Sequence, residues 1–111
     1  MTTISEEAGL LTLINVFTVS AENQDRLVDL LTQATDATVR HAKGFVSAAL
    51  HRSLDGTKVT MYAQWQSMKD YQAMRGDPVA SPYLTEALAI ATFEPGAYMV
   101  AKTFTSSLAD R

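Results

Sequence analysis

Residues 45–66 contain the pattern that most restricts the fold, because two strand-like runs flank a tight turn. FVSAALHRS and TKVTMYAQWQ are both rich in β-branched, aromatic and other apolar side chains. The dipeptide Asp55-Gly56 between them is a strong β-hairpin signal, since both residue types tolerate the backbone of a tight turn. We therefore predict an antiparallel pair of strands over about 45–53 and 57–66.

The flanking segments predict the remaining elements of an α+β domain. Apolar side chains recur at three- and four-residue steps after Ser20, which predicts a helix of about five turns that ends at Lys43-Gly44. Shorter helices are expected after the caps Ser67 and Ser81, with a break at Gly76-Asp77-Pro78 between them. Two further strands are predicted over 10–19 and 97–104, and a turn over 94–96. The resulting order, β-α-β-β-α-α-β, is ferredoxin-like with a four-stranded antiparallel sheet.

Both faces of the predicted sheet are apolar. In the run 10–19 one face would carry Leu10, Thr12, Ile14 and Val16, and the other Leu11, Leu13, Asn15 and Phe17. The next run would put Phe45 and Ala49 on one face, with Val46, Ala48 and Leu50 on the other. Helices cover only one face, so we expect a homodimer packed sheet to sheet. The alternative is cover by a loop or tail of the same chain.

Length and charge narrow the possible functions. The chain has 111 residues, enough for one domain over 1–111 with polar tails at about 1–8 and 105–111. A net charge of −3 argues against a nucleic-acid partner, and the absence of cysteine excludes thiolate chemistry. The first eleven residues lack the basic start of a secretory signal, and we find no apolar run of about 20 residues that would span a membrane. We expect a cytoplasmic protein.

A pocket between sheet and helices is the candidate site. Alternation places Val59, Met61, Ala63 and Trp65 toward the helices, and Lys58, Thr60, Tyr62, Gln64 and Gln66 away from them. Asn15 is an amide within an apolar row, so a neighbour or a ligand must satisfy it. Plain core packing of Trp65 and a structural hydrogen bond of Asn15 remain alternatives. The expected lining is Trp65, Met61, Phe17, Tyr71, Asn15, His51, Arg75 and Tyr83, which suits a flat aromatic ligand.

Other chemistries have little support in the sequence. His41 and His51 have no acidic residue at ligand spacing, so we expect no metal site. No serine lies in a nucleophile-elbow context, and neither a dinucleotide-binding nor a phosphate-binding glycine motif is present. Taken alone, the residues predict an aromatic ligand and no particular reaction.

The segment KGFVSAALHRSLDGTKVTMYAQWQSMKDY, residues 43–71, resembles the antibiotic biosynthesis monooxygenase family, whose members are small dimeric α+β barrels. The stretch YAQWQS, followed by Tyr71 and a later DP…EAL, is similar to the anthrone-oxidising enzymes of aromatic polyketide pathways. The resemblance extends over nearly the whole chain in element order, and over about 43–88 in motifs. Most of these motifs are widely shared in the superfamily, and they specify the fold better than the substrate.

The resemblance implies a monooxygenase that uses neither metal nor flavin, with dioxygen as co-substrate. Its substrate would be a phenolic aromatic polyketide or a quinol-type compound, and its product a quinone. The implied alternative on the same fold is a non-oxidative polyketide cyclase or a small aromatic ligand-binding protein. A structural or regulatory dimer is a third possibility.

The family residues transfer to this chain only in part. The resemblance implies catalytic roles for Trp65 and Tyr71, which match the family tryptophan and helix tyrosine. The anthrone oxidisers carry an asparagine where this chain has Met61, and an arginine near the position of Thr85. Asn15 could supply the missing amide, because haem-degrading relatives carry an asparagine in that strand. Those relatives also need a later histidine, and this chain has none after His51, so haem degradation is not expected.

Overall fold

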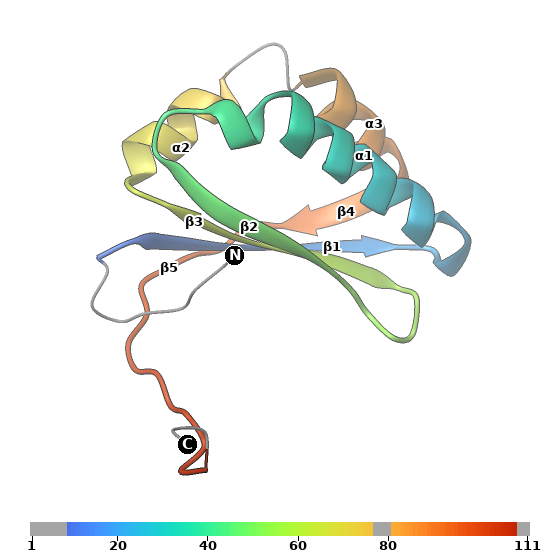
Figure 1. The fold of residues 1–111 in the computed structure, drawn as a ribbon. Helices are drawn as coiled ribbons and strands as arrows, with labels where there is room; N and C mark the ends of the chain where they lie inside the picture. Colours follow the sequence, from blue (N-terminus) through green and yellow to red (C-terminus); the bar gives the residue numbers. More distant parts are fainter. Residues whose placement is uncertain (1–8, 77–80, 109–111) are drawn as a thin grey trace.

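An antiparallel sheet carries helices on one of its faces (Figure 1). The computed structural model describes residues 9–76 and 81–108, and within them the strand order is β2-β3-β1-β4, with β5 also paired to β1. The strands are β1 (Leu11–Val19), β2 (Phe45–Arg52), β3 (Lys58–Trp65), β4 (Ala91–Glu94) and β5 (Ala97–Tyr98). The helices are α1 (Gln24–Ala37), α2 (Met68–Arg75) and α3 (Ser81–Ile90), with short 3-10 turns at Ala21–Asn23 and Val39–His41. The predicted α+β ferredoxin-like class is confirmed, and the sheet of the single chain is open.

The hairpin prediction is confirmed, with one correction to its first strand. Gly56 has the positive φ of 81° that the tight turn requires. Phe45 lies opposite Trp65 and Ala48 lies opposite Ala63, because the register shifts between Phe45 and Ser47. Phe45 therefore shares the helix-covered face with Ala48 and Leu50, and the prediction that it shares a face with Ala49 is wrong. The irregularity adds one residue to β2, which reverses the alternation at that point.

The predicted strand over 97–104 is wrong in most of its length. Only Ala97–Tyr98 pairs with β1. The larger edge segment is β4, where the sequence predicts the end of a helix and a turn. β4 and β5 follow one another along the same edge of β1, and Ile14 N–H donates to Gly96 O (2.9 Å) between them. Pro95 has no N–H to donate, which explains the interruption. From residue 99 the described chain has no regular strand and extends away from the sheet (Figure 1).

The ends of the helices follow the predicted signals with small differences. Ser67 caps α2 as predicted, because its Oγ accepts from the Asp70 N–H (3.1 Å). Gly44 has the predicted positive φ, 84°, but α1 itself ends at Ala37 and the 3-10 turn follows before Gly44. The predicted tail over 1–8, the break at Asp77-Pro78 and the end of the tail at 109–111 lie outside the described residues.

The buried core divides into two clusters under the helices. One centres on Phe17, Leu27, Leu30 and Val59, and includes Ala87 from α3. The other consists of Leu13, Ala63 and Trp65, with Phe45 and Tyr71 packed against it. The division has a local cause on the sheet. Residues 13, 15 and 17 of β1 share the covered face, and Asn15 interrupts that apolar row opposite Met61 of β3.

In the part of the chain that the structure describes, no helix has the length and apolar character needed to cross a lipid bilayer.

Candidate active site

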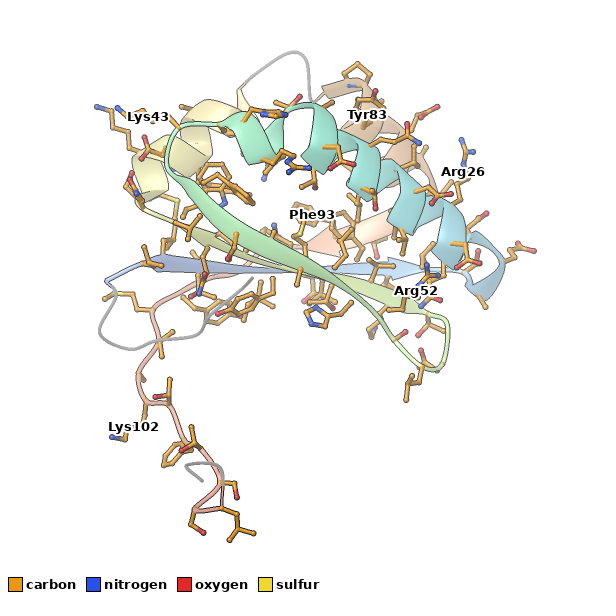
Figure 2. The ribbon with its side chains drawn as sticks, in the orientation of Figure 1. Arg26, Lys43, Arg52, Tyr83, Phe93 and Lys102 are labelled. Atoms are coloured by element: carbon orange, nitrogen blue, oxygen red, sulfur yellow. The ribbon has the colours of Figure 1, made fainter. Side chains whose placement is uncertain are left out.

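A cavity fills the interval between the two core clusters. It has a volume of about 100 Å³, whereas a single water occupies about 10–15 Å³ on this measure. The sheet forms its floor and all three helices contribute to its walls, together with Val39 and Phe93. Figure 2 shows Phe93 between the helix layer and the sheet. The complete lining is Leu13, Asn15, Phe17, Leu31, Ala34, Thr35, Val39, Met61, Ala63, Trp65, Tyr71, Met74, Arg75, Leu84 and Phe93.

Asn15 supplies the main polar group of the floor. Its Oδ1 is buried and has no hydrogen-bond partner among the residues that the structure describes. A buried polar atom of this kind costs about 1–3 kcal/mol unless something satisfies it. The structural hydrogen bond considered as an alternative is absent for this oxygen. The amide thus faces an apolar space in which a ligand can provide the missing partner.

Trp65 joins the cavity to an aromatic cluster at the end of β3. The side chain is 1% exposed, its ring centroid lies 5.4 Å from that of Phe45 and 5.6 Å from that of Tyr71, and both pairs meet edge to face. These contacts fix the orientation of the indole, since edge-to-face packing is the favoured arrangement of neighbouring rings. Trp65 therefore both packs in the core and lines the site.

Tyr71 and Arg75 lie one turn apart on α2 and are hydrogen-bonded. Arg75 Nη1 donates to Tyr71 Oη (2.9 Å), and the guanidinium carbon lies 5.8 Å from the ring centroids of both Tyr71 and Phe93. Because Tyr71 Oη accepts from a cation, its own O–H is available to donate to a substrate oxygen. Arg75 is exposed and Tyr71 is half-buried, so this pair marks the side on which the cavity meets solvent.

Two of the residues predicted for the pocket lie elsewhere. His51 is exposed and lies opposite Thr60, on the sheet face away from the helices, because strand alternation puts it out of phase with Leu50. Tyr83 is half-buried in the helix layer and does not line the cavity (Figure 2). Its neighbour Leu84 takes the inward position, since one residue turns a helix by about 100°. Thr85 is exposed and is also not part of the lining.

A model of the antibiotic biosynthesis monooxygenase family matches residues 10–81. The chain belongs to this family. The match begins at β1 and continues past α2, so it includes β1 and β3, which form the cavity floor. The resemblance seen in residues 43–71 is confirmed.

Individual family members agree with this assignment. Tetracenomycin-F1 monooxygenase of Streptomyces glaucescens is 44% identical over 95 residues, which are 86% of this chain and 85% of that protein. A monooxygenase from the gene ActVA-Orf6 of Streptomyces coelicolor, solved with the ligand nanaomycin D, is 30% identical with a TM-score of 0.71. The alignment covers 89% of this chain and 93% of that protein's chain. SnoaB, a cofactor-independent oxygenase from Streptomyces nogalater, shares the fold at a TM-score of 0.77 and 24% identity, covering 86% of this chain and 97% of that one. The prediction that this chain is a monooxygenase is confirmed.

Several residues that line the cavity were not predicted from the sequence. Leu31, Ala34 and Thr35 come from the inward face of α1, and Met74, Leu84 and Phe93 come from segments after β3. The α1 residues could have been found from their helical spacing beside Leu27 and Leu30. Phe93 could not, because its strand was not expected. Among the described residues, no group of three or more His, Cys, Asp or Glu side chains is placed to hold a metal ion.

Proposed function

We propose that this protein is a cofactor-independent monooxygenase that converts a phenolic aromatic polyketide or quinol-type substrate into a quinone with dioxygen. The observation that carries the proposal is the unpartnered, buried Oδ1 of Asn15 on the floor of an apolar cavity that Tyr71 also lines. A flat polycyclic phenol fits such a site, because its rings are apolar and its oxygens can meet the amide and the hydroxyl. The 44% identity to tetracenomycin-F1 monooxygenase supports the same substrate class.

The proposed reaction needs only substrate and dioxygen. Loss of a proton from an activated ring CH₂ gives an enolate, which passes one electron to dioxygen. The resulting carbon radical and superoxide couple through a new C–O bond and take up the proton to form a hydroperoxide. Cleavage of its O–O bond with loss of water leaves the carbonyl of the quinone, so one oxygen atom enters the product and the other leaves as water.

The protein's contribution is to hold the enolate in a dry, oriented state. We assign catalytic roles to Asn15, Tyr71 and Trp65. Asn15 Oδ1 accepts a hydrogen bond from a phenolic O–H of the substrate, the Tyr71 hydroxyl donates to the substrate oxyanion, and the Trp65 indole fixes the ring plane. Arg75 strengthens the Tyr71 donor through its 2.9 Å hydrogen bond. Phe17 and Met61 bind the apolar faces of the substrate. His51 and Tyr83 receive no role, because neither lines the cavity.

The test is oxygen uptake by the purified protein, treated with a chelator, in the presence of anthrone and air. We expect quinone absorbance to rise with one dioxygen consumed per quinone formed, above the spontaneous rate. A Tyr71→Phe variant should retain binding and lose most of the rate. Tight binding of anthrone with no rate above the spontaneous one would instead favour a cyclase or a binding protein, a function that Met61 in place of the oxidisers' asparagine also suggests.

We further propose a homodimer formed through the sheet face that the helices leave uncovered. Ile14, Val16 and Tyr62 lie on that face, and Tyr62 Oη is buried without a partner in the single chain. The described end of the chain also exposes Met99 (80%) and Phe104 (86%) as it extends away from the sheet (Figure 1). Sedimentation should give a dimer at micromolar concentration and an Ile14→Lys variant should be monomeric. A monomeric wild-type protein would refute the dimer. We place the enzyme in the cytoplasm, where a chain without cysteine needs no oxidising compartment.

A further inference from the structure

A second hollow lies beside the main cavity, between α1 and β2. It has a volume of about 140 Å³ and its rim includes the exposed residues Thr32 and Asp36. Its floor exists because Ala48 presents only a methyl group toward the helix, which leaves space under α1. The lining consists of Thr32, Thr35, Asp36, Ala48, Ala49, Leu50 and Met61.

Met61 and Thr35 line both spaces, so they form the partition between them. Thr35 is fixed, because its Oγ1 donates to Leu31 O (2.8 Å) within α1. Met61 is half-buried and unbranched, with three rotatable side-chain bonds, and it points from the floor toward the helix. Removing the Met61 side chain would therefore join the two spaces. Truncating a residue that lines only the main cavity would not.

We propose that Met61 is the specificity-determining residue of this site and that its side chain limits how far a polycyclic substrate extends toward β2. The proposal rests on the proposed function in assuming that the main cavity holds the fused rings. The hollow then takes a substituent carried by an outer ring, and Met61 excludes the larger of these substituents in the wild-type enzyme.

The residues of the hollow define the class of substituent. Ala48, Ala49 and Leu50 are apolar, and Thr32 adds a hydroxyl at the rim. Asp36 is the charged group of the lining, and its carboxylate is paired with Arg40 (3.1 Å). An uncharged alkyl or hydroxyalkyl chain fits this lining, and an acidic chain does not, because it would meet the Asp36 carboxylate.

The experiment compares Met61→Ala with Met74→Ala on two substrates, anthrone and an anthrone that carries a butyl group on an outer ring. Met74 is a matched control, since it lines the main cavity but not the hollow. We expect Met61→Ala to raise the ratio of kcat/KM for the butyl compound to that for anthrone by about tenfold or more, as expected for several added methylenes. Met74→Ala should leave the ratio within about twofold. An unchanged ratio in Met61→Ala, or the same rise in both variants, would overturn the proposal.

Binding provides a readout that does not depend on turnover. Trp65 is the only tryptophan and lines the main cavity, so quenching of its fluorescence reports occupancy by anthraquinone and by butylanthraquinone. If neither variant nor wild type consumes oxygen but Met61→Ala alone gains affinity for the butyl compound, the proposed function fails and the partition stands. If Met61→Ala does not fold, Met61→Val shortens the same side chain and should give a smaller rise in the same ratio. No rise in Met61→Val would then count against the proposal.

Discussion

Replacing Asn15 by leucine should stabilise the free protein and impair its chemistry, a combination that only a ligand-directed amide explains. Asn15 Oδ1 is buried without a partner, and its carbonyl oxygen is the kind of group whose isolation costs about 1–3 kcal/mol. The residue is half-buried as a whole, which places the expected gain near the lower end of that range. Leucine has nearly the same shape and would join Leu13 and Phe17 in one apolar row. We expect the free energy of unfolding to rise by about 1 kcal/mol, or about 4 °C in Tm for a domain of this size.

The same substitution removes the acceptor for a phenolic O–H of the substrate. A buried donor left without a partner costs about 1–3 kcal/mol, so kcat/KM should fall by a factor of about 5–150. Urea titration of the free protein measures the first effect, and initial rates of oxygen uptake with anthrone measure the second. Both must be measured on the same preparation, because the two effects are expected to have opposite signs.

Thr38→Val is the matched control for this variant. Thr38 Oγ1 is also a buried oxygen without a hydrogen-bond partner among the described residues, and Thr38 does not line the cavity. Valine keeps the shape of threonine, so we expect a comparable gain in stability with kcat/KM unchanged. An Asn15→Leu protein that is less stable than wild type, with activity falling in parallel, would refute the reasoning and make the amide a structural group.

Three further predictions test other parts of the structure. Trp65→Phe should lower kcat/KM by about tenfold or more while costing less than the roughly 3–5 kcal/mol of a full truncation, and a loss of activity no larger than the loss of folded protein would return Trp65 to a purely structural role. In urea titrations, Gly44→Ala should destabilise the fold by about 1–3 kcal/mol more than Gly56→Ala. Both glycines have positive φ, but only at Gly44 would an added Cβ clash with the Asp70 side chain, 2.5 Å from its Cβ. Equal losses of stability in the two variants would show that backbone strain alone matters. Hydrogen bonds from the Thr57 side chain, the Thr57 N–H and Ser53 lower the pKa of Asp55 from 3.8 to about 2. The ionised carboxylate therefore stabilises the hairpin fully above about pH 4, and this contribution is lost as the pH falls toward 2. Thr57→Val should move the Asp55 pKa measured by NMR back toward 3.8, and an unchanged pKa would contradict the assigned cause.

The sequence was sufficient for the elements whose signals are local. The hairpin follows from Asp55-Gly56 between two strand-forming runs, and the start of α2 follows from Ser67 three residues before Asp70. Period-two alternation also placed Asn15, Phe17, Met61 and Trp65 correctly on the covered face of β1 and β3. These predictions needed no knowledge of distant contacts, because turn chemistry, capping and alternation are properties of a few consecutive residues.

Two of the errors occurred where distant contacts decide. Ala91, Thr92 and Phe93 continue the apolar spacing of α3, and only pairing with residues 17–19 of β1 makes them a strand. The irregularity in β2 likewise leaves no mark in the residue types between Phe45 and Ser47, although it decides which of them meet Trp65. His51 was assigned to the pocket from its chemistry, and alternation alone, applied from Leu50, would have excluded it.

The position of the cavity follows from two paired residues, Asn15 and Met61, in an otherwise closed core. Asn15 and Met61 face each other across β1 and β3, between the cluster of Leu13, Ala63 and Trp65 and the cluster built on Phe17 and Val59. An amide cannot join an apolar cluster without cost, and an unbranched thioether fills space less firmly than a β-branched or aromatic side chain. The pair therefore leaves a gap at the one place where the two clusters would otherwise merge. This predicts that the double variant Asn15→Leu/Met61→Ile closes the cavity, stabilises the fold by more than Asn15→Leu alone, and abolishes the quenching of Trp65 by anthraquinone. Retained quenching would show that the aromatic ligand binds outside the cavity.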